Sequence, residues 1–379
     1  MEREERKTKG NVDMEKRPIV FYAPVGTGVP AHLLGGGEKG CRRTREILET
    51  AGYKVFVVVK ANMSHGTIEY MKCAVKAYFT VYRLLRENPD SILYVVGFYE
   101  KNLLLESVLI HMGAKSHKTI YEARNGRLVK AYQEKGKSYK KLMDYVLIKA
   151  DIIFAQGLEY VDFIKDNYGK TAVYTPNYVL NRNLKPYVSN RTFDSIRLLY
   201  FGRVAESKNV DVVVKIAAEL EKRGYQTQTT LIGGYTKEYK KRLDSTITVC
   251  GLNTEKVRIL GQQPFERICD ELQKAHFFVF PSQEKMEGHS NSLTEAMTFG
   301  VVPIVSAAGF NASIVGKNEV VISKINYLMF ADAIEKILKE NLWETYSKFV
   351  YNRIKENYTE DIVKHSIFCA IDELENKKK

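Results

Sequence analysis

The sequence predicts an α/β protein of two domains, each built on a parallel sheet with helices on both faces. Short apolar segments alternate with longer amphipathic ones along most of the 379 residues, a pattern typical of strand–helix–strand units. Some apolar segments are uninterrupted, such as VFVVV at 55–59, as expected for strands buried on both faces. A polar, irregular stretch at 181–195 separates two copies of this plan, which predicts an interdomain linker there.

In the first half, the strand IVFYA at 19–23 precedes a glycine-rich loop that includes Gly35, Gly36 and Gly37. A helix is predicted over 41–50, and Gly52 ends it. The later predicted strands are 55–59, 92–96, 119–122, 151–155 and 171–174. The later predicted helices are 67–87, 101–112 and a long basic one at 127–149.

The second half repeats the alternation of strand and helix. Its predicted strands are 197–201, 228–232, 257–260, 277–280 and 302–306. Its predicted helices are 210–223, 235–250, 265–275 and 291–299. From 328 onward the chain is expected to form consecutive helices, with a break near 357–359 and Thr359 as an N-cap.

The expected divisions follow from these elements. They are a flexible charged tail at 1–17, an N-terminal domain at 18–180, the linker at 181–195, a C-terminal domain at 196–340 and closing helices at 341–379.

Composition and charge narrow the class of protein. Five scattered cysteines fit neither a zinc site nor a disulfide framework, so a reducing cytosol is the simplest setting. No apolar run approaches the roughly 18 residues that span a bilayer, and the charged N-terminus lacks the apolar core of a signal peptide. A cytoplasmic location is therefore expected.

The net charge of +13 is concentrated in the N-terminal half, where residues 101–150 hold 11 Lys and Arg against 4 Asp and Glu. This excess indicates an anionic partner: a membrane surface, a phosphorylated substrate or nucleic acid. A solvated helical face is an equally simple explanation. Nucleic acid is disfavoured, because no RNP, KH, zinc-finger or basic-arm pattern is present.

Charged side chains follow two predicted strands at the edge where ligands bind in open α/β sheets. Strand 197–201 runs into Gly202, Arg203 and Lys208, and strand 277–280 leads to the helix at 291–299. Arg, Lys and a helix N-terminus together favour a diphosphate. Carboxylates favour sugar hydroxyls, and Glu287 and Glu295 lie before and inside that helix. The expected ligand is a nucleotide-sugar.

Two motifs make the prediction specific. The chain reads FGRVAESK at 201–208 and PSQEKMEGHSNSLTEAMTFGVVPIVS at 281–306. We call residues 281–306 the signature segment. Together the two motifs resemble the donor-binding half of family 4 retaining glycosyltransferases of the GT-B fold, of the kind that acts in bacterial surface-polysaccharide synthesis. That resemblance covers about 195–310 and implies two Rossmann-like domains facing a deep cleft, with the C-terminal helices packing back toward the N-terminal domain.

The resemblance also implies roles for particular residues. Arg203 and Lys208 would bind the diphosphate and stabilise the leaving group, Glu295 would accept the ribose hydroxyls, and Glu287 would face the transferred sugar. The remaining donor-binding positions are Gly202, Gly288, His289, Ser290, Asn291 and Ser292.

The N-terminal half offers weaker candidates for the acceptor side of the site. Gly35, Gly36 and Gly37 match the family's glycine-rich loop, and a flexible connection is the alternative. Where many relatives have a histidine, this chain reads YEARN at 121–125. That departure places Glu122 or Arg124 near the cleft, or pairs them with each other inside the domain.

The predicted activity is retaining transfer of a sugar from a nucleoside-diphosphate-sugar to a hydroxyl acceptor, a glycan or a polyprenyl-diphosphate-linked molecule. No acidic pair is placed after a strand to hold a metal–diphosphate, and Arg203 and Lys208 can supply that charge, so neither metal nor cofactor is expected. The basic helix at 127–149 either rests on an anionic membrane, making the protein peripheral, or is a packed helix with a lysine-rich surface. A nucleotide-sugar epimerase or hydrolase on the same scaffold is the alternative activity.

Overall fold

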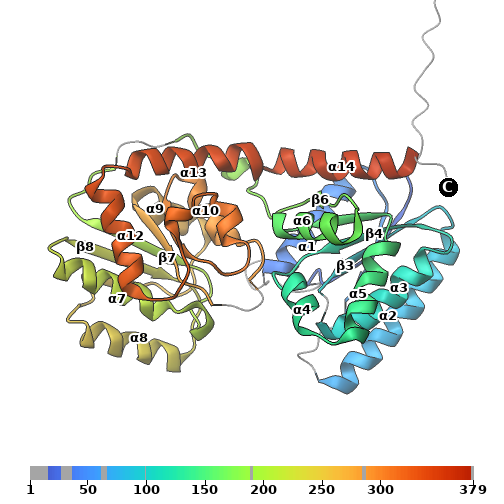
Figure 1. The fold of residues 1–379 in the computed structure, drawn as a ribbon, viewed down its shortest axis with the longest axis horizontal. Coiled ribbons are helices and arrows are strands. Elements are labelled where there is room, and N and C mark those ends of the chain that lie inside the picture. The colour runs from blue at the N-terminus through green and yellow to red at the C-terminus, as the bar shows by residue number, and fades with distance from the viewer. Residues whose placement is uncertain are drawn as a thin grey trace, which may run out of the picture.

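The computed structural model describes residues 16–26, 36–60, 66–98, 100–187, 191–283 and 287–376. Two six-stranded parallel sheets lie side by side along the long axis of the molecule (Figure 1). The predicted fold class, two Rossmann-like α/β domains, is confirmed. Residues 1–15 of the predicted tail and Gly35 of the glycine-rich loop lie outside the described residues.

The N-terminal sheet has the order β2-β1-β3-β4-β5-β6, and all its pairs are parallel. Its strands are β1 (Ile19–Ala23), β2 (Val55–Val59), β3 (Ile92–Gly97), β4 (Lys118–Ala123), β5 (Ile152–Ala155) and β6 (Val173–Tyr174). Strands β1, β3 and β4 are buried along their whole length. Helices cover both faces of the sheet, so the apolar side chains of these strands are removed from water on each face.

The helices of this half match the sequence-based expectation with three exceptions, one of which is the start of the first helix. They are α1 (Gly36–Thr50), α2 (Thr67–Glu87), α3 (Leu103–Gly113), α4 (Leu128–Glu134), α5 (Lys137–Lys149) and α6 (Leu158–Tyr168). The single helix predicted at 127–149 is wrong: the chain breaks at Lys135 and at Gly136, which are extended residues at the two helix ends. Helix α6 was not predicted.

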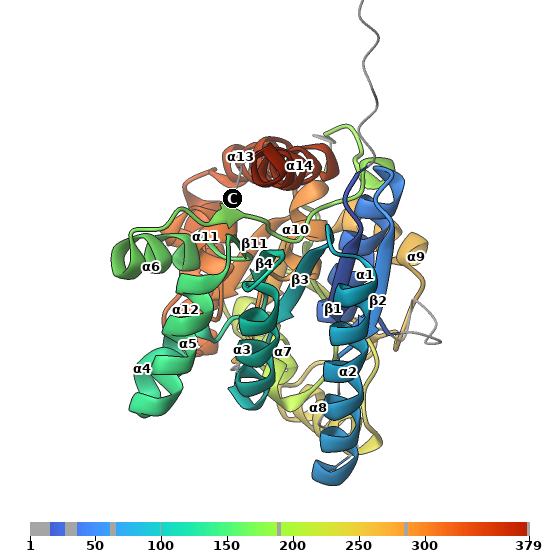
Figure 2. The same cartoon turned by 90° about the vertical axis from the view of Figure 1, so that its right-hand side faces the viewer.

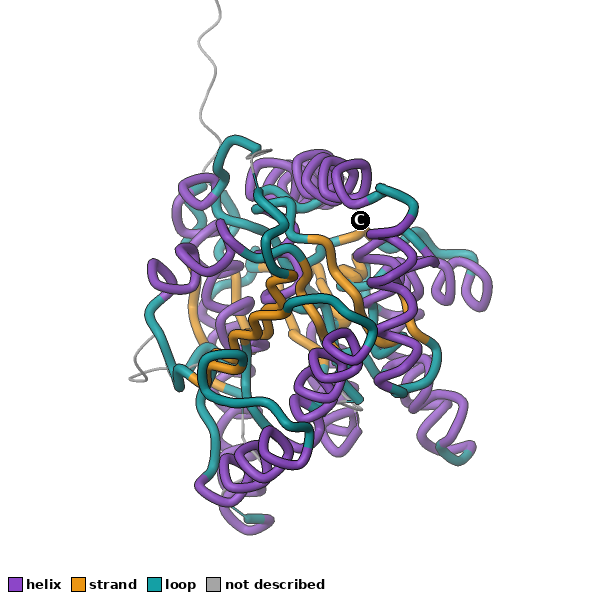
Figure 3. Tube along the Cα trace, turned by 90° about the vertical axis from the view of Figure 1, so that its left-hand side faces the viewer, coloured by secondary structure: helices purple, strands orange, loops and turns teal. Residues whose placement is uncertain are grey.

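Figure 3 views the molecule from the side of the C-terminal half. The sheet of this half has the order β12-β11-β10-β7-β8-β9. Its strands are β7 (Ile196–Phe201), β8 (Thr227–Ile232), β9 (Val257–Ile259), β10 (Phe277–Phe280), β11 (Val302–Ser306) and β12 (Val321–Ile322). Its helices are α7 (Val210–Lys222), α8 (Lys237–Val249), α9 (Phe265–Lys274), α10 (Asn291–Thr298) and α11 (Asn311–Val315). The short elements α11 and β12 were not predicted.

Three consecutive helices, α12 (Tyr327–Lys339), α13 (Trp343–Asn357) and α14 (Glu360–Asn376), end the described chain. Helices α13 and α14 form one band across the top of both halves (Figure 1). Val363, Ile367 and Ile371 of α14 belong to the apolar core of the N-terminal sheet, together with Ile19 and Phe21. The closing helix therefore packs against the N-terminal domain, as the fold class implied.

None of the helices in the described ranges is long and apolar enough to cross a membrane.

Candidate active site

The candidate site lies where loops from the two halves meet, at the carboxyl ends of their strands. On the C-terminal side these loops follow β7, β8 and β10, the edge where ligands of open α/β sheets bind. Gly202 and Gly233, the residues just after β7 and β8, have φ of 141° and 150°. A Cβ on Gly233 would lie 1.6 Å from the Gly202 carbonyl oxygen, so this close turn requires glycine.

Lys208 and Glu287 form a buried ion pair at the centre of this edge. Ser282 joins them: its hydroxyl donates to Glu287 Oε2 (2.6 Å) and lies 3.4 Å from Lys208 Nζ. The Lys208 ammonium also lies over the Phe280 ring, 5.3 Å from its centroid. Lys208 comes from one sequence motif and Glu287 from the other. The fold brings them together although they are 79 positions apart in the chain.

Local geometry explains why Lys208 points inward. Asn209 adopts a left-handed conformation (φ 49°) between the short 3-10 turn at Glu206–Lys208 and helix α7. Its side-chain amide donates to the Pro281 carbonyl oxygen (3.0 Å), and the Gln283 N–H donates to the Ser207 carbonyl (2.8 Å). The FGRVAESK loop and the signature segment are therefore fastened side by side.

Helix α10 presents its N-terminus to the same edge. Ser290 is its N-cap and accepts from the Leu293 N–H. A Cβ on Gly202 would lie 3.9 Å from Ser292 Oγ, so the loop that carries Arg203 runs beside the first turn of α10. Arg203 itself is exposed, and its carbonyl accepts from the buried Tyr200 hydroxyl (2.6 Å). This combination of helix N-terminus, Lys208 and Arg203 suits an anionic group.

Glu295 faces the N-terminal domain from inside α10. Part of the residue reaches solvent, yet its carboxyl group is enclosed by protein, and this desolvation raises its pKa to about 7. Arg43 and Lys39 of α1 act in the opposite direction and lower that pKa. Two cations missed by sequence reasoning therefore face the predicted ribose-binding carboxylate. A Cβ added to Gly36, at the start of α1, would lie 3.7 Å from Asn291 Nδ2.

The signature segment is also held by polar residues that follow N-terminal strands. Asn177, after β6, donates through Nδ2 to the His289 carbonyl (2.6 Å). Gln156, after β5, accepts from the His289 N–H (3.4 Å) and donates to Asn177 Oδ1 (3.1 Å). We call Gln156 and Asn177 the amide pair. It fixes the backbone two residues beyond Glu287 and was not predicted.

Gly126 brings the N-terminal domain very close to the backbone of the signature segment. A Cβ at this position would lie 1.5 Å from the Glu287 carbonyl oxygen and 3.2 Å from the Gly288 nitrogen. Gly126 therefore lets the N-terminal domain reach the backbone of the residue that pairs with Lys208. No sequence pattern indicated this, because Asn-Gly pairs such as the one at 125–126 are common in ordinary turns.

His289, predicted as a donor-binding residue, has a buried side chain. Its ring makes an edge contact with Tyr358 (5.1 Å between centroids), and neither ring nitrogen has a hydrogen-bond partner among the described residues. Burial, assisted by the nearby Arg124 guanidinium, lowers its pKa to about 3. In this arrangement His289 contributes mainly through its backbone, which the amide pair binds.

Replacing His289 by phenylalanine should preserve activity and reduce acid sensitivity. Between about pH 6.5 and 3 the unfolded state binds a proton at this histidine and the folded state does not, so the histidine makes stability fall as pH falls through that window. Phenylalanine removes that effect together with two unpartnered polar atoms. Melting temperatures from pH 7 to 4 would show a shallower decline in H289F. A large loss of donor affinity in H289F would instead support direct donor contact.

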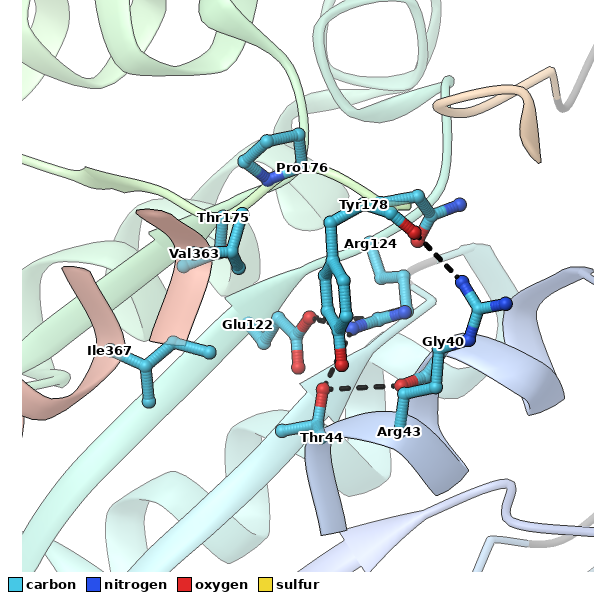
Figure 4. Close-up of a pocket in the computed structure, with 11 residues that line it drawn as sticks. Gly40, Arg43, Thr44, Glu122, Arg124, Thr175, Pro176, Tyr178, Val363 and Ile367 are labelled. Carbon is cyan, nitrogen blue, oxygen red and sulfur yellow. Dashed lines mark hydrogen bonds and ion pairs between the residues drawn. The ribbon is translucent and has the colours of Figure 1, made fainter. Parts of the chain in front are cut away.

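Glu122 and Arg124 form the internal ion pair that was one of their two predicted alternatives. Arg124 Nε donates to Glu122 Oε1 (2.7 Å), and its Nη2 donates to Thr44 Oγ1 (3.1 Å). Tyr94 donates its hydroxyl to Glu122 Oε2 (2.9 Å). Figure 4 shows the pair between α1 and the segment at 175–178. Both side chains are almost fully buried, so they support the packing of α1 rather than present free charge.

Gly36 and Gly37 form the first turn of α1, so the helix starts earlier than the predicted residue 41. A Cβ on Gly37 would lie 3.1 Å from the Phe98 ring. In the ranges that the structure describes, no group of three or more His, Cys, Asp or Glu side chains is placed to hold a metal ion.

Part of the chain is similar to a described protein family. Residues 186–356 match the family model described as glycosyl transferases group 1. No curated protein sequence matches the chain.

Solved structures share this fold over nearly the whole chain. Sucrose-phosphate synthase from Thermosynechococcus elongatus has a TM-score of 0.70 at 17% identity, covering 95% of this chain and 99% of that one. A glycosyltransferase from Rickettsia africae has a TM-score of 0.70 at 13% identity, covering 96% and 100%. Anabaena HepE in complex with UDP has a TM-score of 0.68 at 14% identity, covering 94% and 100%.

The fold is therefore GT-B, and residues 186–356 of the C-terminal half are similar to group 1 glycosyl transferases. Together they support glycosyltransferase activity for this chain.

Proposed function

We propose that the protein is a retaining glycosyltransferase that moves a sugar from a nucleoside-diphosphate-sugar to a hydroxyl acceptor. The observation that carries this proposal is the buried Lys208–Glu287 pair beside the N-terminus of α10. It places a cation, a carboxylate and a helix N-terminus at one point, the set that a sugar diphosphate requires. Anabaena HepE has been solved with UDP and with UDP-glucose, which makes uridine sugars the first donors to test.

Each residue then has a defined task. Arg203, Lys208 and the α10 N-terminus stabilise the charge that develops on the departing diphosphate. Glu295 accepts hydrogen bonds from the ribose hydroxyls, for which its carboxyl group must be ionised. Glu287 orients the transferred sugar. In this structure the Lys208 ammonium pairs with Glu287. When the donor is bound, the same ammonium interacts with the diphosphate as well.

The transfer needs no separate catalytic base. The bond between the anomeric carbon and the diphosphate oxygen breaks, and the acceptor oxygen bonds to that carbon on the same face of the sugar. The acceptor proton passes to an oxygen of the departing phosphate. We propose that no metal ion is needed, because Arg203 and Lys208 supply the positive charge.

We further propose that the acceptor is a glycan or a polyprenyl-diphosphate-linked molecule used in surface-polysaccharide synthesis on the inner face of the cytoplasmic membrane. The resemblance of the signature segment to family 4 enzymes supports this assignment. So does the excess of basic residues at 101–150, which suits an anionic acceptor.

Donor binding and stereochemistry provide the test. A nucleoside-diphosphate-sugar that binds only the folded state raises the melting temperature, so a panel of such sugars should single out one donor. With an acceptor, NMR of the product should show the anomeric configuration of the donor, with EDTA having no effect. An inverted product would refute retention, and conversion of the donor without any acceptor would instead indicate the epimerase or hydrolase.

A further inference from the structure

Helix α2 carries apolar side chains on two different faces. Ala77, Val81 and Leu85 are buried against the domain. Five other apolar residues are between 43% and 74% exposed, and we call them the α2 stripe: Ile68, Met71, Val75, Phe79 and Tyr82. Their spacing of three or four residues places them on one side of a helix. The α2 stripe is therefore a continuous apolar strip that the rest of the chain, as described, leaves open.

The neighbouring helix extends this exposed surface. Helix α3 runs beside α2 (Figure 2), and the Tyr70 hydroxyl donates to Asn102 Oδ1 (3.0 Å) where α3 begins. Leu104 and Val108 of α3 are exposed in turn. Seven of the fifteen large apolar side chains exposed in the described part of the chain thus lie on α2 and α3. Scattered exposed apolar residues are ordinary, but a concentration of this kind marks an interaction surface.

Basic residues border the α2 stripe. With about 100° of rotation per residue, the stripe spans about 80° of the helix circumference, and Lys72, Lys76 and Arg83 occupy about the next 60°. All three are exposed. Glu69 and Glu87 lie further round the helix, 3.9 Å from Lys72 and from Arg83 respectively. An apolar strip with a basic border is the pattern of a helix that lies in the interface of an anionic membrane.

The surrounding helices favour a bilayer over a second copy of the chain. Helix α5 packs on the other side of α3 and adds exposed Lys137, Lys141 and Lys149. A self-association through the α2 stripe would bring these positive charges together. The headgroups of anionic lipids would instead attract these lysines. Each Lys or Arg near the surface contributes about 1 kcal/mol to the free energy of membrane binding.

The position of α2 connects this surface to the site. Strand β2 ends at Val59, on the sheet edge that faces the signature segment, and α2 is the next helix in the chain. In Figure 1, α2 runs diagonally along the lower right of the N-terminal domain, and its lower end is the end nearer to the other domain. A bilayer held against α2 would therefore lie close to the edge of the candidate site.

We propose that the α2 stripe docks the N-terminal domain onto an anionic lipid bilayer. Phe79, Met71 and Val75 enter the boundary between headgroups and acyl chains, while Lys72, Lys76 and Arg83 contact lipid phosphates. This assigns membrane contact chiefly to α2 rather than to the basic helices α4 and α5. Docking stands independently of sugar transfer, although its use in delivering a lipid-linked acceptor rests on the proposed function.

Co-sedimentation with vesicles tests the proposal. The full chain should sediment with vesicles of equimolar phosphatidylcholine and phosphatidylglycerol, and much less with phosphatidylcholine alone. M71S/V75S/F79S should reduce binding to the level of neutral vesicles. In K72Q/K76Q/R83Q each lost charge should lower partitioning about fivefold. Val249, which is 86% exposed on α8, provides the matched control: V249S should bind like the wild type.

Two further measurements keep the result interpretable. The donor-induced shift in melting temperature should be unchanged in M71S/V75S/F79S, which shows that the fold and the donor site are intact even if transfer itself proves different from the proposal. Sedimentation velocity reports the oligomeric state. Docking is refuted if the wild type ignores anionic vesicles, if the apolar variant binds them equally well, or if that variant only converts a dimer to a monomer.

Discussion

Replacing Lys208 by alanine should lower the rate of sugar transfer by about 10²–10³-fold or more, as expected when one preorganised charge is removed from a developing anion. Lys208 is buried and pairs with Glu287, so its ammonium is fixed before the donor arrives. The effect should fall on kcat, because the charge on the diphosphate grows as the bond to the sugar breaks. Adding R203A should deepen the loss. A double variant with a near-normal rate would refute the assignment of both residues.

Stability and chemistry must be separated in this experiment. Removing one partner of a buried ion pair costs about 3–5 kcal/mol because the other charge is left uncompensated, so K208A alone could lose activity by unfolding. K208A/E287Q removes both charges and should recover most of the melting temperature while remaining inactive. The matched control is K215A on α7, which breaks a more exposed ion pair with Asp211 and should keep the wild-type rate.

The sequence predicted the fold well wherever one segment carries its own pattern. Strands such as 19–23 and 277–280 were found because their uninterrupted apolar residues have no stable place outside a buried sheet. The single helix at 127–149 was wrong, since a lysine-rich pattern continues across Gly136 and hides the break. Helix α6 was missed because only Tyr160 and Ile164 on it are buried, leaving little apolar periodicity to detect.

The same distinction holds for the candidate site. Lys208, Glu287 and the first turn of α10 were predictable because each belongs to a local sequence motif that begins at a strand end. The contributions of the N-terminal domain were not, since they depend on contacts between distant positions: Asn177 binds the His289 backbone across 112 residues. Arg43 and Lys39 were unpredicted for a related reason, as their helix faces Glu295 only once the two domains are packed together.

Substituting alanine for Gly126 should lower transfer by about 10²-fold, the loss expected when reacting groups are displaced by about 1 Å. The new methyl group would lie 1.5 Å from the Glu287 carbonyl oxygen, so either the signature segment or the whole N-terminal domain must move. Either movement changes the position of Glu287 and Lys208 relative to the N-terminal domain, and therefore the position of the donor sugar relative to the acceptor. Steady-state kinetics with the identified donor and acceptor would measure the loss.

The effect should be confined to the contact between the domains. Arg203, Lys208 and α10 all belong to the C-terminal domain, so the shift in melting temperature caused by UDP should persist in G126A while transfer falls. Gly136 is the matched control: it has a φ of −71°, and no atom lies within 4 Å of the position that an added methyl group would take, so G136A should behave like the wild type. If G126A transfers at full rate, the close approach of Gly126 to Glu287 is not part of the arrangement in which the sugar moves. If G126A instead loses UDP binding as well, the N-terminal domain shapes the donor site itself, and the division of labour between the two domains must be redrawn.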